Sequence, residues 1–107
     1  MTLKSLLITG AFLASASIAS AAGHSTVHTV TIKGFAFEPS NLTIAVCDSV
    51  NFVNLDGAPH TATQTDGAFD TGRLSRNDES TIVFTAAGLY AYFCGIHTSM
   101  TAQITVE

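Results

Sequence analysis

Hydrophobic and polar residues alternate along most of the chain with a period of two. The alternation begins near Val27 and continues to the C-terminus. It is typical of strands that bury one face, and no stretch shows the 3.6-residue period of an amphipathic helix. The apolar positions of the expected strands are Val30 and Ile32, Phe35 and Phe37, Leu42, Ile44 and Val46, Ile82 and Phe84, and Ile104 and Val106.

Turn-forming residues separate these strands at short intervals, and the polar residues 73–78 predict a loop. Seven or eight short strands joined by such turns in one small domain indicate an all-β fold, a Greek-key β-sandwich. The turn signals are Lys33-Gly34, Glu38-Pro39-Ser40-Asn41, Cys47-Asp48-Ser49, Asp56-Gly57, Asp66-Gly67 and Ala87-Gly88.

The first 21 residues have the pattern of a secretory signal peptide. Lys4 precedes an apolar segment, and small residues follow it, so we expect cleavage after Ala21 or Ala22. A membrane anchor fits less well, because the apolar segment is short and is broken by Gly10 and several serines. We therefore expect an exported protein, in the bacterial periplasm, with one domain over residues 22–107.

Charge limits the classes of partner. The expected mature domain has three Lys and Arg side chains against eight Asp and Glu, a formal net charge of −5. Nucleic acid is excluded as a partner, because its recognition needs basic patches that neutralise phosphates. An acidic protein is expected to meet a basic partner surface more readily.

A thiolate, an imidazole and a thioether follow one another at three-residue intervals near the C-terminus. They are Cys94, His97 and Met100. Two histidines and one cysteine in a plane, with a weak axial methionine, form the blue-copper electron-transfer site. The segment therefore predicts a copper site that needs a second histidine from elsewhere in the chain.

Three further histidines are candidates for this second ligand. His24 and His28 lie near the expected mature N-terminus and the start of the first strand, where no loop presents them. His60 follows Pro59 in the turn after a predicted strand, and a stiff loop at one end of a sandwich suits a preorganised metal site. We therefore expect His60 to complete the copper site.

The two cysteines are not expected to form a disulfide. Pairing is the usual fate of two cysteines in an exported chain. Because Cys94 cannot bind metal and also pair with Cys47, we expect Cys47 to remain a free thiol.

The strand that leads to Cys94 has a predictable orientation. Tyr90, Tyr92 and Cys94 share one face, so Phe93 is expected to point outward. Tyr90 follows a turn and is a candidate corner tyrosine, whose hydroxyl bonds back to the backbone.

Five segments together resemble the small cupredoxins, or blue copper proteins. The two-residue gap between His97 and Met100 is similar to that of the amicyanin-like members. The resemblance covers nearly all of the expected mature chain and implies one type 1 copper, with His60, Cys94 and His97 equatorial and Met100 axial. The segments are residues 34–39 (GFAFEP), 50–54 (VNFVN), 58–61 (APHT), 66–72 (DGAFDTG) and 92–100 (YFCGIHTSM).

Three positions depart from the pattern of this family. Thr98 stands where amicyanin-like loops usually carry Pro, and Thr61 where several relatives have Asn. The backbone N–H of Thr61 remains able to reach the Cys94 sulfur, although its side-chain brace differs. Cys47 replaces a usual Gly and either accepts a strained φ or changes the turn.

The expected function is single-electron transfer between exported redox partners, such as a cytochrome or a dehydrogenase. By resemblance, His97 is the most exposed ligand, and the docking surface around it includes Ala58, Pro59 and Ile96. We expect a monomer and not an enzyme.

Three other functions compete with electron transfer. A copper carrier or storage protein would use the same ligands without redox turnover. A thiol enzyme would use Cys94 and His97 as nucleophile and base, but no third orienting residue is apparent in the sequence. A mere binding sandwich would leave four suitable ligands unexplained. Separately, a second Cu(II) site at His24 is conceivable if the chain starts at Ala22, although a disordered tail is the preferred interpretation there.

Overall fold

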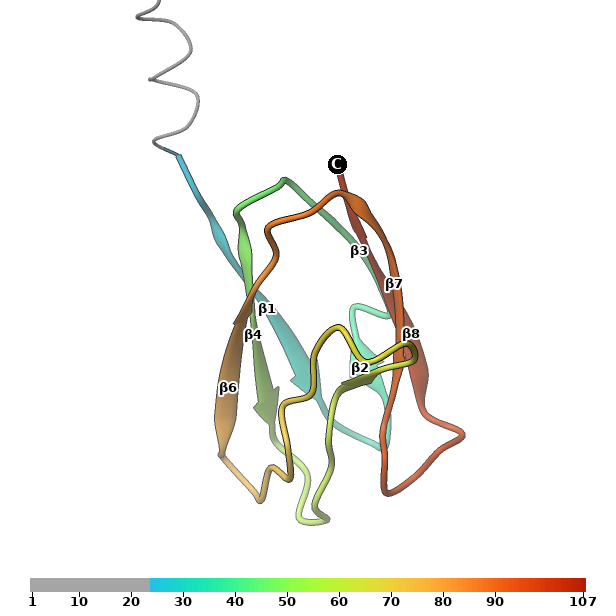
Figure 1. Ribbon diagram of the computed structural model, residues 1–107. Helices are drawn as coiled ribbons and strands as arrows, with labels where there is room; N and C mark the ends of the chain where they lie inside the picture. Colours follow the sequence, from blue (N-terminus) through green and yellow to red (C-terminus); the bar gives the residue numbers. More distant parts are fainter. Residues whose placement is uncertain (1–23) are drawn as a thin grey trace, which may run out of the picture.

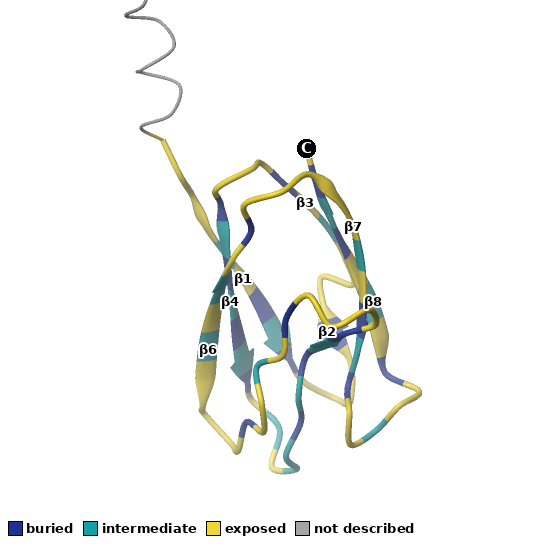
Figure 2. Ribbon diagram, viewed as in Figure 1, coloured by how far each residue is buried: buried dark blue, intermediate teal, exposed yellow. Residues whose placement is uncertain are grey.

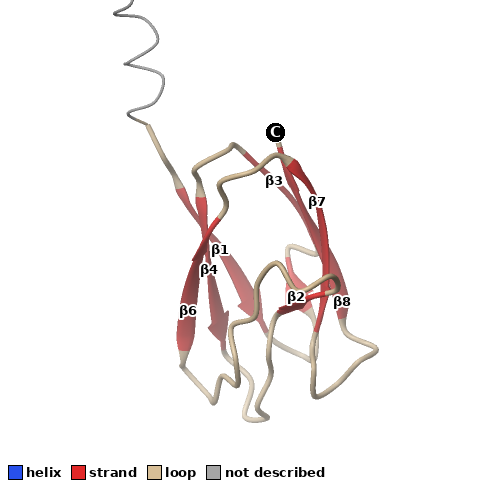
Figure 3. Cartoon of the chain, in the orientation of Figure 1, coloured by secondary structure: helices blue, strands red, loops and turns tan. Residues whose placement is uncertain are grey.

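The computed structural model describes residues 24–107, so the expected signal peptide lies outside the described residues. Eight strands follow one another, and the described part of the chain contains no helix (Figure 3). Accordingly, residues 24–107 include no helix able to cross a membrane. The strands are β1 (Val27–Ile32), β2 (Phe37–Glu38), β3 (Asn41–Ile44), β4 (Ser49–Asn54), β5 (Thr63–Gln64), β6 (Glu79–Val83), β7 (Gly88–Phe93) and β8 (Thr101–Val106).

The strands form two four-stranded sheets that face each other (Figure 1). Their orders are β2-β1-β4-β6 and β3-β8-β7-β5. Two neighbouring pairs, β1 with β4 and β3 with β8, run parallel and are not consecutive in the chain. Such crossed connections between two sheets belong to a Greek-key sandwich. The predicted all-β sandwich is confirmed.

The core lies between the sheets and explains the period of two. In β4 every second residue is buried, and the same alternation appears in β1 and β8 (Figure 2). Side chains on one face of each strand leave water while the other face remains in it. The fully buried aliphatic and aromatic members include Val30, Ile32, Val50, Phe52, Tyr92 and Ile104.

Two residues expected to be buried are exposed. Phe35 is 51% exposed, because residues 33–36 form a tight turn closed by bonds between Lys33 and Ala36, and β2 starts only at Phe37. Val46 lies beyond the end of β3, where the chain turns toward β4. The prediction of inward side chains at these two positions was wrong, since both follow the strand rather than belong to it.

The orientation of β7 agrees with the sequence. Tyr92 and Cys94 are buried, Ala91 is exposed and Phe93 is half-buried on the outer face. The hydroxyl of Tyr90 donates to the carbonyl of Ala86 at 2.7 Å, so the predicted corner tyrosine is confirmed.

Candidate metal centre

The site lies at the end of the sandwich where β1, β4 and β7 finish, the lower end in Figure 1. The loop from β4 to β5 supplies His60, and the loop from β7 to β8 supplies Cys94, His97 and Met100. Both loops are fixed by backbone bonds. His60 exchanges two bonds with Leu74, and in the second loop Met100 accepts from Cys94 and donates to His97, each bond 3.0 Å long.

Three donor atoms meet at this end. The Nδ1 atoms of His60 and His97 are 3.1 Å apart, and they lie 3.7 and 3.8 Å from the sulfur of Cys94. Metal bonds of about 2.0–2.1 Å to nitrogen and 2.3 Å to sulfur, as for zinc, place neighbouring ligand atoms about 3 to 4 Å apart. The three atoms are therefore spaced as ligands of one ion.

The four predicted ligands differ in exposure. His60 and Cys94 are completely buried and Met100 nearly so, whereas His97 is half-buried. The structure brings the donor atoms of His60, Cys94 and His97 together, with His97 closest to solvent, and backbone bonds to Cys94 and His97 hold Met100 in the same loop. His28 lies at the opposite end, where it bonds Asp48, and exposed His24 belongs to no cluster. Within residues 24–107, His60, Cys94 and His97 form the one group of such side chains able to hold a metal ion.

Two backbone N–H groups point at the Cys94 sulfur. Those of Thr61 and His97 each lie 3.4 Å from it. Such donors stabilise negative charge on sulfur, which is the form that binds metal. The expected contact from Thr61 is confirmed, and the thiolate is supported from both loops.

The side chain of Thr61 takes part in a second connection. Its hydroxyl accepts a bond from the Gly95 amide at 2.7 Å and lies 2.9 Å from the hydroxyl of Thr63. Thr63 in turn donates to Asp70 at 3.2 Å. This chain of hydroxyls braces the Cys94 loop against the loop that carries His60.

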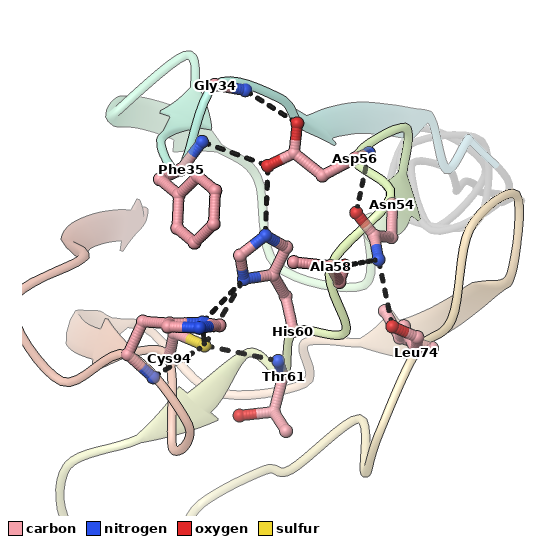
Figure 4. Close-up of polar contacts among 10 residues, drawn as sticks. Gly34, Phe35, Asn54, Asp56, Ala58, His60, Thr61, Leu74 and Cys94 are labelled. Carbon is pink, nitrogen blue, oxygen red and sulfur yellow. Dashed lines mark hydrogen bonds and ion pairs between the residues drawn. The ribbon is translucent and has the colours of Figure 1, made fainter.

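Two further residues at the site are absent from the sequence-based prediction. Asp56 lies 2.9 Å from the outer nitrogen of His60, and buried Asn54 bonds the backbone of Asp56, Ala58 and Leu74 (Figure 4). The Phe35 N–H bond, with those from Gly34 and His60, lowers the pKa of Asp56 although burial opposes this. Asp56 therefore faces His60 as a carboxylate. Its place four residues before His60 is the available signal in the sequence, but the Asp56-Gly57 pair by itself predicts only a turn.

Cys47 is far from this site, in the turn that precedes β4. It is exposed and unpaired, so the prediction of no disulfide between the two cysteines is confirmed. Its φ is +78°, so Cys47 has the left-handed backbone conformation that glycine usually adopts, and the turn itself is unchanged.

Comparison with known proteins settles the family. Residues 5–106 match the model of the cupredoxin-like domain. The chain belongs to the cupredoxins. It is 34% identical to the chloroplast plastocyanin of Chlamydomonas reinhardtii over 84 residues, which cover 66% of this chain and 58% of that protein.

Solved structures agree. A Cu(I) form of an amicyanin mutant superposes with a TM-score of 0.72 and 27% identity, over 76% of this cupredoxin and 82% of that chain. The Cu-containing nitrite reductase of Thermus scotoductus gives a TM-score of 0.71 and 33% identity, over 75% of this chain but only 22% of the reductase.

The donor set of this site is suited to copper. Both of these solved relatives are described as copper proteins. The donor set found here fits the same metal, because imidazole suits copper and a soft thiolate favours Cu(I).

Proposed function

We propose that this cupredoxin is an electron carrier in which His60, Cys94, His97 and Met100 would hold one copper. The observation that carries the proposal is the meeting of three donor atoms within 4.8 Å of one another. They come from positions 34 and 37 residues apart in the chain. Copper bound there supplies one-electron exchange between Cu(I) and Cu(II).

The chain's contribution is rigidity. Asp56 holds His60, Leu74 fixes the backbone of His60, and the N–H groups of Thr61 and His97 hold the sulfur of Cys94. Ligands fixed in this way change their positions little when the charge on the metal changes. Little rearrangement favours fast electron transfer over tight storage.

The electron enters and leaves at the exposed edge of His97. The surface there is apolar: Phe35 and Ile96 are 51 and 41% exposed, and Ala58 and Pro59 are half-buried. Phe35 extends the docking surface that the sequence predicts, since its ring lies against that of His97. A small apolar surface suits brief contact with a redox protein, such as a cytochrome or a dehydrogenase. The protein acts as an exported monomer in this proposal.

A thiol enzyme is the main alternative from another class. The structure supplies the orienting carboxylate that sequence analysis missed, since Cys94, His60 and Asp56 form a connected series. However, Cys94 and His60 are completely buried, so a substrate has no access to the sulfur. The burial favours a metal site and not a nucleophile.

A copper storage protein is the alternative from within copper biology, and voltammetry separates it from a carrier. The copper-loaded protein is expected to give a reversible one-electron wave and to keep its metal during repeated cycles. Loss of copper to a competing chelator in either oxidation state, without a reversible wave, would favour storage.

A further inference from the structure

Asp56 links His60 to the loop between β1 and β2. Its Oδ1 accepts the amide of Gly34 at 2.7 Å, and its Oδ2 accepts the amide of Phe35 at 2.9 Å. The same Oδ2 lies 2.9 Å from Nε2 of His60 (Figure 4). One carboxylate, with a side chain only 13% exposed, therefore receives three donors.

The bond to His60 determines which of its two ring nitrogens carries the proton. A carboxylate only accepts hydrogen bonds, so Nε2 carries the proton and Nδ1 keeps its lone pair. That Nδ1 faces the sulfur of Cys94 and the ring of His97. Carboxylate partners of this kind orient ligating histidines and raise their donor strength.

The bond to Phe35 places an aromatic ring over the site. Phe35 has φ of +56°, a costly conformation for a bulky side chain. Its ring meets the rings of His60 and His97 edge-on, with centroids 5.0 and 4.9 Å away. The two N–H bonds to Asp56 hold the turn in this conformation, so the ring stays against both histidines.

We propose that Asp56 is a positioning residue for the metal site, which sets the His60 tautomer and holds Phe35 across both histidine rings. The proposal deepens the proposed function and rests on it for the effect on copper. The tautomer itself is a property of the metal-free protein and is tested independently.

The test compares Asp56→Asn with Asp78→Asn. Asparagine has one acceptor oxygen, so at least one of the three donors at position 56 loses its partner, and the negative charge is removed. Asp78 lies near the same end, where it accepts the amide of Ser75 and has no bond to a histidine. The control therefore removes an equal charge without the contact.

Three quantities are measured for each variant: the His60 tautomer by ¹⁵N NMR of the metal-free protein, the affinities for Cu(II) and Cu(I), and the reduction potential. Asp56→Asn is expected to lower the ratio of the Nε2–H to the Nδ1–H tautomer at least tenfold. It should weaken Cu(II) binding by about 10–100-fold. The affinity for Cu(I) should fall about tenfold less than that for Cu(II), because the negative charge of Asp56 stabilises the more highly charged ion more strongly. This difference corresponds to a reduction potential about 59 mV higher in the variant. Asp78→Asn is expected to change each quantity less than twofold.

The double variant Phe35→Gly/Asp56→Asn guards against a failure to fold. Glycine adopts the φ of position 35 without strain, so that turn no longer needs Asp56. The double variant is compared with Phe35→Gly alone, and the tautomer ratio is expected to differ between these two proteins as it does between Asp56→Asn and wild type.

An unchanged tautomer and potential in Asp56→Asn, or equal changes in Asp78→Asn, would overturn the proposal. A wild-type protein without a thiolate–copper band would refute the proposed function, while the tautomer would still decide the role of Asp56.

Discussion

Thr61 receives the amide of Gly95 on its hydroxyl oxygen at 2.7 Å, which ties the loop of His60 to the loop of Cys94. The direction of the bond between the hydroxyls of Thr61 and Thr63 follows from the next contact along the chain, that of Thr63 with Asp70. Because Thr63 donates to Asp70, it accepts from Thr61. Each hydroxyl therefore both donates and accepts, and such chains strengthen one another.

Replacing Thr61 by Val should loosen this brace while keeping its shape. The amide of Gly95 loses its acceptor, and we expect the metal-free protein to lose about 1 kcal/mol of unfolding free energy in urea. Thr65→Val is the control, since exposed Thr65 makes a comparable bond to Ala91 away from the metal site. The copper absorption band is expected to shift only in Thr61→Val. Equal spectra for the two variants would argue against the brace.

The two tyrosines of β7 should respond in opposite directions to loss of their hydroxyls. The hydroxyl of Tyr92 is buried without a hydrogen-bond partner among residues 24–107, and burial raises its pKa. The ring of Tyr92 packs against the rings of Phe37, Phe52 and Phe69. Tyr92→Phe should therefore raise the unfolding free energy by about 1 kcal/mol or more, since a buried unpaired hydroxyl costs about 1–3 kcal/mol.

Tyr90→Phe is the matched variant, because Tyr90 donates to Ala86. It should lower the unfolding free energy by about 0.5–1.5 kcal/mol. Chemical denaturation of both variants under the same conditions checks the pair. A loss of stability in Tyr92→Phe would show that its hydroxyl is satisfied in solution.

Acid should weaken the opposite end of the sandwich through Asp48. The bond from His28, with those from the amides of Thr26 and Ala45, lowers the pKa of Asp48 to about 2. In the unfolded chain this carboxyl has a pKa of about 3.9. The unfolded state therefore binds the proton first as the pH falls, so the stabilisation is complete above about pH 4 and is lost toward pH 2.

Unfolding free energies of wild type and Asp48→Asn, measured from pH 6 to pH 2, test this expectation. The difference between them should shrink as the pH falls from about 4 to 2. A difference that stays constant over this range would contradict the assigned role of Asp48.

The sequence predicted the strands, the sandwich and the meeting of His60 with Cys94 and His97 because each leaves a local pattern in the chain. Alternation identified the buried face of β4, and the spacing of Cys94, His97 and Met100 identified the metal loop. Phe35 was misplaced because alternation continues through the turn although the strand has ended. Whether a side chain beyond a strand end is buried depends on the loop's path.

Asp56 and Asn54 were missed for a different reason. Their roles depend on partners brought together by the fold, such as Gly34 for Asp56 and Leu74 for Asn54. No local pattern in the sequence predicts that the β1–β2 turn lies against the loop of His60. Such contacts become visible only when both sheets are in place.

The central claim, that Cys94 binds copper as a thiolate, is tested most directly by visible absorption during titration of the metal-free protein with Cu(II). Cys94→Ser and Cys47→Ser are titrated alongside it, because they remove the two thiols one at a time. We predict an intense blue band that saturates at one equivalent in wild type and in Cys47→Ser, and that is absent in Cys94→Ser. A band that survives in Cys94→Ser, or no band in wild type while copper still binds, would contradict the account.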